Sequence, residues 1–169
     1  VKNFARETDQ PLTIGILLDT SGSQQNVLAI EQQAGAQFLQ RVLSAKDEAF
    51  LISFDINSNL LADYTNNPRV LRAAMEKAQI NTGAGYGGAI PQSNPKGTVL
   101  YDAVYLGAHD KLGTETGRKA MVLLTDGEDQ GSDLTLNGAI EAAQKADTIV
   151  YVLLCADRGV YSGGIGYTG

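Results

Sequence analysis

The chain has 169 residues, of which 43% are hydrophobic and 19% charged, and its formal net charge is −6. This length predicts one domain with a sizeable core, and the composition is that of a globular protein and not of a disordered one. The acidic balance argues against a nucleic-acid or anionic-membrane surface, because both favour basic patches. No apolar run is long enough to span a bilayer, so we expect no direct membrane insertion.

Short apolar segments alternate along the chain with segments of helical periodicity. The expected strands cover residues 12–18, 48–54, 59–64, 119–124 and 148–154, and the expected helices cover 27–43, 68–77, 99–111 and 134–145. We expect Asn26 to be the N-cap of the first helix and Pro68 to begin the second. Strand 59–64 is expected to pair with strand 48–54 across the turn-forming residues DINS.

Strands that are separated by helices predict βαβ units. The expected fold is therefore a Rossmann-like α/β sandwich of three layers. Its central sheet is mostly parallel with one short antiparallel edge strand, and helices cover both faces.

Glycine-rich segments at 81–97 and 157–169 are expected to form loops, and long loops in compact domains tend to carry function. Both contain a G-x-G-x-x-G match, at 83–88 and 164–169. The dinucleotide-binding fingerprint needs a strand directly before it and a helix directly after it, so we expect no nucleotide site here. The loop tyrosines either form a contact surface or are exposed without a role; they are Tyr86, Tyr161 and Tyr167.

The first expected strand is buried yet ends in polar side chains. Asp19, Ser21 and Ser23 follow its apolar residues with alternating spacing. A helix cap would explain one of them, since Asp and Ser are preferred caps, but not all three. A turn that projects alternate side chains in one direction would gather a carboxylate and two hydroxyls around one point. Three such oxygens suit a small hard cation.

Two further residues follow at comparable places. Asp126 comes after strand 119–124, and ligands of open α/β sheets bind at the carboxyl ends of strands, so Asp126 and Asp19 are expected to converge at one edge. Taken alone, Asp126 is better explained as a turn residue before Gly127. Taken alone, Thr98 is better explained as the N-cap of helix 99–111.

Three segments together, LLDTSGSQ, GTVLYDAV and LLTDGED, resemble the von Willebrand factor type A domain in their order and approximate separation. TDGEDQGSD and KADTIVYVLL are similar to bacterial members. In this family the three loops build the metal-ion-dependent adhesion site. The resemblance implies that the serine hydroxyls bind the ion directly, that the other ligands bind it directly or through water, and that the ion is Mg²⁺, or else Mn²⁺ or Ca²⁺. The implied metal ligands are Asp19, Ser21, Ser23, Thr98 and Asp126.

The implied function is that of a metal-dependent protein-interaction module for adhesion or assembly, not an enzyme. Neutral hydroxyls compensate a divalent ion poorly, which leaves it able to bind an Asp or Glu carboxylate of a protein partner. Related bacterial domains favour an extracellular or cell-envelope location, although cytoplasmic relatives also exist. One alternative is a metal-dependent hydrolase or phosphatase. The sequence argues against this alternative, because no histidine is placed to act as a base. Another is a structural domain with no working metal site.

The resemblance runs from about residue 12 to residue 154, and residues 1–169 are expected to form a single domain of this type. The family normally continues after the fifth major strand with a helix and another strand, which we do not find in this sequence. Either the sequence is a truncated fragment, or another chain or segment completes the sheet; an edge strand that is missing would leave an open sheet edge, which favours association.

Other polar residues are expected to have simpler roles. Asp102 is interpreted as structural, His109 as a solvated residue near a helix end, and Cys155 as a small buried residue. Five more acids either line the rim of the metal site or belong to a solvated face, which is the simpler interpretation; they are Asp55, Asp63, Glu128, Asp129 and Asp133.

Overall fold

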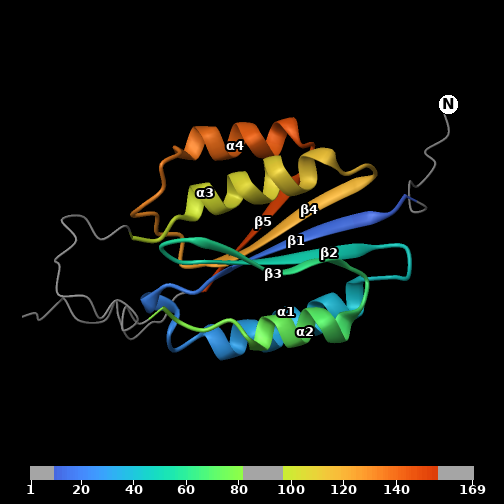
Figure 1. Cartoon of the computed structure of the whole chain (residues 1–169), viewed down its shortest axis with the longest axis horizontal. Helices are drawn as coiled ribbons and strands as arrows, with labels where there is room; N and C mark the ends of the chain where they lie inside the picture. The colour runs from blue at the N-terminus through green and yellow to red at the C-terminus, as the bar shows by residue number, and fades with distance from the viewer. Residues whose placement is uncertain (1–9, 82–96, 156–169) are drawn as a thin grey trace, which may run out of the picture.

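A computed structural model of the chain describes residues 10–81 and 97–155. In these residues a five-stranded sheet lies between two layers of helices (Figure 1). The strands are β1 (Leu12–Asp19), β2 (Glu48–Phe54), β3 (Ser58–Thr65), β4 (Arg118–Thr125) and β5 (Ile149–Leu154). The helices are α1 (Leu28–Val42), α2 (Pro68–Glu76), α3 (Leu100–Tyr105) and α4 (Leu136–Lys145).

The order of the strands across the sheet is β3-β2-β1-β4-β5, and only β3 is antiparallel to its neighbour. This arrangement confirms the predicted fold class, including the antiparallel edge strand. Asp19 lies opposite Phe54, and Leu18 lies opposite Leu124. The three central strands therefore end at the same edge of the sheet, where the polar residues follow.

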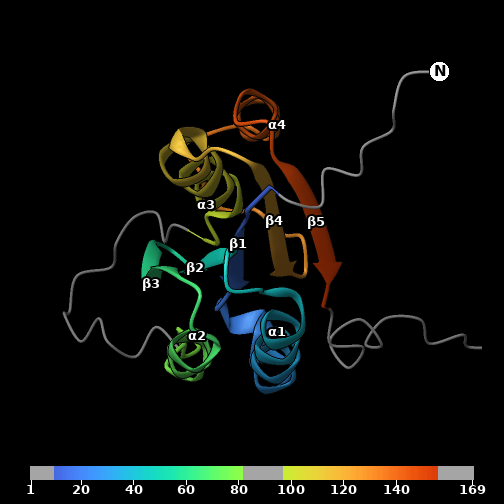
Figure 2. The ribbon, with the colours of Figure 1, turned by 90° about the vertical axis from the view of Figure 1, so that its right-hand side faces the viewer.

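Both faces of the central strands are buried, as is usual for parallel sheets. Ile16 and Leu18 of β1 pack in a cluster with side chains of α1 and α2, whereas Leu17 packs in a second cluster with side chains of α3 and α4. Figure 2 shows these two helix pairs on opposite sides of the sheet. The packing on both faces holds β1 in place and so fixes the position of its polar end.

Three predicted helix boundaries differ from the structure. Asn26 is not the N-cap of α1: the chain first forms a 3-10 turn (Gly22–Gln24), and the helix begins after Val27, which caps it without a side-chain hydrogen bond. The predicted helix 99–111 is α-helical only to Tyr105 and continues as a π-helical segment (Leu106–Lys111) and a 3-10 turn (Leu112–Thr114). Helix α4 begins two residues later than predicted, because the Thr135 side chain accepts a hydrogen bond from the backbone N–H of Gly138.

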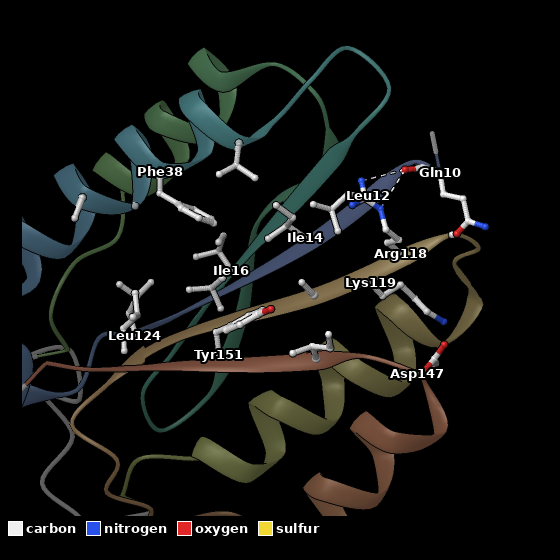
Figure 3. Close-up of a pocket in the computed structure, with 18 residues that line it drawn as sticks. Gln10, Leu12, Ile14, Ile16, Phe38, Arg118, Lys119, Leu124, Asp147 and Tyr151 are labelled. Carbon is white, nitrogen blue, oxygen red and sulfur yellow. Dashed lines mark hydrogen bonds between the residues drawn. The ribbon is translucent and has the colours of Figure 1, made fainter. Parts of the chain in front are cut away.

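Strand β5 differs from the other parallel strands because most of its side chains are exposed. Ile149 is 60% and Leu154 is 69% exposed. A groove of about 880 Å³ runs between α1 and strands β1, β4 and β5, and is lined by Phe38 and Tyr151 among others (Figure 3). In the described part of the chain, no strand pairs with the outer edge of β5.

Two interpretations of single residues can be checked. His109 is exposed and stacks on the Tyr105 ring, as expected for a solvated residue near a helix end. Cys155 is partly buried, whereas the sequence predicted a buried residue. The predicted loop tyrosines and both G-x-G-x-x-G matches lie outside the described residues.

Candidate metal centre

The carboxylate of Asp19 is held from two sides. Asp19 is the last residue of β1 and is fully buried. Its Oδ1 accepts a hydrogen bond of 2.9 Å from the backbone N–H of Ser21, and its Oδ2 accepts one of 2.6 Å from the hydroxyl of Thr125. Both bonds orient the carboxylate, and the remaining lone pairs of its oxygens are available to other ligands.

The two serines of the first loop present their hydroxyls next to each other. Ser21 has an extended backbone before the 3-10 turn, and it makes no side-chain capping bond. Its Oγ lies 3.0 Å from the Oγ of Ser23. Neighbouring ligands of an octahedral Mg²⁺ ion lie about 2.9 Å apart when the metal–oxygen distances are about 2.0–2.1 Å. The spacing of the two hydroxyls therefore fits two adjacent ligands of such an ion.

Thr98 belongs to a loop that is fastened to its neighbours through the backbone. Its carbonyl oxygen accepts hydrogen bonds of 3.0 and 3.1 Å from the backbone N–H groups of Gln130 and Gly131. The next residue, Val99, donates from its N–H to the carbonyl oxygen of Asp55 at 2.7 Å and is the N-cap of α3. The alternative assignment of Thr98 as the helix cap is therefore wrong, and its side chain does not serve as a cap.

Glycines allow this loop and the one after β4 to touch. A side chain added at Gly131 would collide with the backbone of Gly97, and one added at Gly97 would collide with Gln130. The close approach holds Thr98 against the loop that begins at Asp126.

Asp126 follows β4 directly and is half-buried. Its Oδ1 accepts a hydrogen bond of 3.2 Å from the backbone N–H of Glu128, which is the turn contact that the alternative interpretation predicted. This bond does not exclude a second role, because carboxylate oxygens accept several hydrogen bonds or bind a cation at the same time. Asp126 also lies near enough to Asp19 for its carboxylate to raise the pKa of Asp19.

The electrostatics of the site favour a cation. Burial raises the pKa of Asp19, the hydrogen bonds from Ser21 and Thr125 offset part of this effect, and the nearby Asp126 carboxylate adds to the increase. Two acids in a poorly solvated place repel each other, and a divalent ion would relieve that repulsion. Among the described residues, no group of three or more His, Cys, Asp and Glu side chains is placed to hold a metal ion. The hydroxyl and carboxylate oxygens gathered here are of the kind that hard cations prefer.

Two nearby acids hold the loops together. The carboxylate of Asp102 accepts hydrogen bonds from the backbone N–H groups of Asp133 and Leu134, at 3.0 and 2.9 Å, which confirms its structural role. Asp129 accepts a hydrogen bond of 2.5 Å from the hydroxyl of Ser132. These contacts join the start of α3 to the loop after β4.

The remaining rim acids have separate contacts. Asp63 does not reach the rim: it lies on β3, away from the sheet edge that carries Asp19, and pairs with Lys111 at 2.5 Å. Asp55 accepts a hydrogen bond of 3.0 Å from the backbone N–H of Asn57, and Glu128 accepts one of 3.0 Å from the side chain of Gln130.

Sequence reasoning missed Thr125 and Gly131, which hold the loops of the site in place, and it missed Glu31, a buried acid of α1 whose pKa is raised by Asp19 and Asp126 among other causes. Thr125 was detectable, because a parallel register that pairs the ends of β1 and β4 places it beside Asp19. The contact of Gly131 and the burial of Glu31 depend on loop and helix packing, for which the sequence carries no local signal.

The chain is thus a three-layer α/β sandwich whose parallel strands end in hydroxyl and carboxylate groups at one edge. No protein-family model and no curated protein sequence matches it. Solved structures do match: the vWF domain of the type V pili tip protein Mfa5 from Porphyromonas gingivalis has a TM-score of 0.54 and 18% identity, over 70% of this chain and 38% of that one. The chain has the von Willebrand factor type A fold.

Two further structures share this fold. Proximal thread matrix protein 1 from the mussel byssus, with a zinc-occupied MIDAS motif, has a TM-score of 0.66 and 14% identity, over 83% of this chain and 35% of that one. The pilus adhesin SpaC from Lactobacillus rhamnosus GG, in an open conformation, has a TM-score of 0.65 and 15% identity, over 87% of this chain and 24% of that one. The chain therefore spans between 24% and 38% of the length of these three proteins.

Proposed function

We propose that this domain is a metal-dependent protein-interaction module, in which a divalent cation binds a carboxylate of a protein partner. The proposed ligands of the cation are Asp19, Ser21, Ser23, Thr98 and Asp126. The observation that carries the proposal is the 3.0 Å spacing of two serine hydroxyls next to a carboxylate that is oriented by hydrogen bonds to both of its oxygens.

The donor set favours Mg²⁺, with Mn²⁺ or Ca²⁺ as alternatives. All five proposed ligands supply oxygen, which hard cations prefer, and Mg²⁺ in particular retains several waters in protein sites. Three of the ligands are neutral hydroxyls, so the ion keeps part of its charge. An Asp or Glu side chain of a partner would replace a water and neutralise that charge.

We propose further that the domain binds without catalysing a reaction. The sequence contains one histidine, His109, which lies nine residues after the start of α3. At about 1.5 Å per helical residue, this is roughly 13 Å from the end of the helix that adjoins Thr98. A general base must reach its proton by a hydrogen bond or through one water, so His109 is poorly placed for the alternative hydrolase or phosphatase activity.

An adhesion or assembly role at the cell envelope or outside the cell is supported by two similar structures, which come from a pilus tip protein and a pilus adhesin. Over the residues that the structure describes, no helix has the length and apolar character needed to cross a bilayer.

We also propose that the outer edge of β5, with which no strand of the described residues pairs, is a site of association. Charged residues and proline usually protect edge strands from pairing with other strands. Strand β5 contains neither. Val152 and Leu153 are 56% and 51% exposed. Burial of these side chains and pairing of the free backbone groups would both favour contact with another strand.

The carboxylate preference can be tested with a panel of short peptides that contain a single Asp or Glu, each matched with its Asn or Gln counterpart. We expect binding of some acidic peptides with Mn²⁺ present, no binding in EDTA, and no binding of the amide counterparts. Binding that is equal in EDTA, or equal for acids and amides, would contradict the proposal.

A further inference from the structure

Within the described residues, one buried acid outside the five proposed ligands has no hydrogen-bond partner. Glu31 lies in the first turn of α1 and is only 2% exposed. Neither of its carboxylate oxygens has a hydrogen-bond partner among the described residues. Burial without a partner is unfavourable for the ionised and for the protonated carboxyl group, because each leaves polar atoms unsatisfied. Such a group needs an explanation.

The contacts of Glu31 lead to the metal site. The Cys155 thiol lies beside its carboxylate, and burial together with this carboxylate raises the pKa of the thiol to about 12. The backbone N–H of Cys155 donates to the carbonyl oxygen of Thr125 at 2.9 Å. Thr125 is the residue whose hydroxyl orients Asp19. A short chain of contacts thus connects Glu31 on α1 to the edge of the sheet where the proposed ligands lie.

The charges around Glu31 also connect it to the metal site. Burial raises the pKa of Glu31, and the Cys155 thiol offsets part of this effect. The carboxylates of Asp19 and Asp126 raise it further, so both lie near enough to repel it. Three acids therefore share one poorly solvated region, although the N-terminus of α1 favours the charged form of Glu31 to some extent.

We propose that Glu31 is a positioning residue of the candidate metal site and accepts hydrogen bonds from water molecules that the cation holds. The inference rests on the proposed function. A hydrated divalent ion would bring what Glu31 lacks, namely positive charge and O–H donors, without direct coordination by its carboxylate. Outer-shell acceptors of this kind orient the ligands of metal sites, and their loss typically lowers metal affinity by about 10- to 100-fold.

The test compares Glu31→Gln with the matched control Glu76→Gln. Glu76 is on α2 in the same helix layer, is 59% exposed and pairs with Arg72, so its replacement changes the net charge equally but far from any buried acid. Two quantities are measured for each variant: the affinity for Mn²⁺ by calorimetry on EDTA-stripped protein, and the thermal unfolding midpoint in EDTA. If Glu31→Gln does not fold, Glu31→Met, which removes the polar group at similar length, takes its place.

We expect Glu31→Gln to bind Mn²⁺ about tenfold more weakly or worse, with an unfolding midpoint in EDTA that is equal to or higher than that of the unmodified protein. Replacement of a residue with a purely structural role would instead lower the unfolding midpoint in EDTA together with the affinity. Glu76→Gln is expected to change neither quantity. Unchanged Mn²⁺ affinity in Glu31→Gln would overturn this inference and leave the proposed function intact. Absence of Mn²⁺ binding in the unmodified protein would overturn both.

Discussion

The hydroxyl of Thr125 donates a buried hydrogen bond of 2.6 Å to Oδ2 of Asp19, although the two residues are 106 positions apart in the sequence. Thr125 ends β4 and Asp19 ends β1, and these strands are neighbours in the sheet. The same hydroxyl accepts a hydrogen bond of 3.1 Å from the backbone N–H of Gly127. One side chain therefore connects the first loop of the site to the loop that begins with Asp126.

Replacement of Thr125 by Val tests this connection. Thr125→Val keeps the shape of the side chain but removes the donor to Asp19, which leaves a buried carboxylate oxygen without its partner. We expect the free energy of unfolding to fall by about 1–3 kcal/mol, and the affinity for Mn²⁺ to fall about tenfold. Denaturant unfolding and calorimetry measure the two quantities. Thr125→Ser keeps the hydroxyl and should keep most of the stability and most of the affinity for Mn²⁺. Equal losses in the two variants would show that the hydrogen bond to Asp19 does not cause them.

The close approach of Gly131 to Gly97 makes a second prediction. Gly131→Ala places a methyl group against the backbone of Gly97 and must push the two loops apart. We expect a loss of about 1–3 kcal/mol of stability and weaker Mn²⁺ binding, because Thr98 moves with its loop. Gly138→Ala in α4 is the control, since an added methyl group there makes only ordinary contacts. If Gly131→Ala binds Mn²⁺ as tightly as Gly138→Ala, the contact does not position the site.

Asp47 gives the fold a defined dependence on pH. Its Oδ1 accepts a hydrogen bond of 2.8 Å from the backbone N–H of Leu12, and its Oδ2 accepts bonds of 3.0 and 2.5 Å from the N–H and hydroxyl of Ser44. Burial alone would raise the pKa of this carboxyl, but the hydrogen bonds outweigh burial and lower it from 3.8. A pKa that is lower in the folded state stabilises the fold above the unfolded value, and this contribution is lost as the pH falls through the folded value.

Asp47→Asn should therefore be less stable than the unmodified protein by about 1–2 kcal/mol at pH 7. The difference should begin to shrink below about pH 4, where the unfolded state takes up a proton at Asp47, and should shrink further as the pH falls toward the lower pKa of the folded state. Urea unfolding at a series of pH values between 7 and 3 measures the difference. A difference that is constant over this range would mean that the charge of Asp47 contributes nothing.

The open edge of β5 predicts association that depends on concentration. Val152→Lys places a charge on this strand and should lower the average mass in sedimentation experiments at high protein concentration, because a charge disfavours strand pairing. Val70→Lys on α2 makes the same change at a side chain that is 48% exposed and far from β5, and should leave the mass unchanged. A monomeric unmodified protein, or equal effects of the two variants, would exclude the edge as an association site.

Sequence patterns were sufficient for the fold because its central strands are short, continuously apolar and separated by helical segments. The same patterns were weaker at the helix ends. Nothing local distinguishes Asn26 from a cap, and the chain instead uses these residues for turns that lead from Asp19 into α1. The exposure of β5 was also hidden, because its apolar residues look like those of a buried strand.

The candidate site could be proposed from three short motifs, but not the contacts that support it. Asp19, Ser21 and Ser23 are close in sequence, and their grouping follows from local spacing. Thr125 meets Asp19 because of the strand register, and the burial of Glu31 results from the packing of α1, and both are properties of the whole fold. Residues such as Thr125 and Glu31 can be identified only when burial and hydrogen bonds are known.

The proposed function requires that the hydroxyls and carboxylates after β1 and β4 bind a divalent cation. Calorimetric titration of Mn²⁺ into EDTA-stripped protein tests it most directly, with Ser23→Ala as the matched variant because the Ser23 side chain is exposed and does not hold Asp19 in place. We expect saturable binding at one site and an affinity that is at least about tenfold lower in Ser23→Ala, with the same unfolding midpoint in EDTA. No saturable binding in the unmodified protein, or equal affinity in the variant, would contradict it.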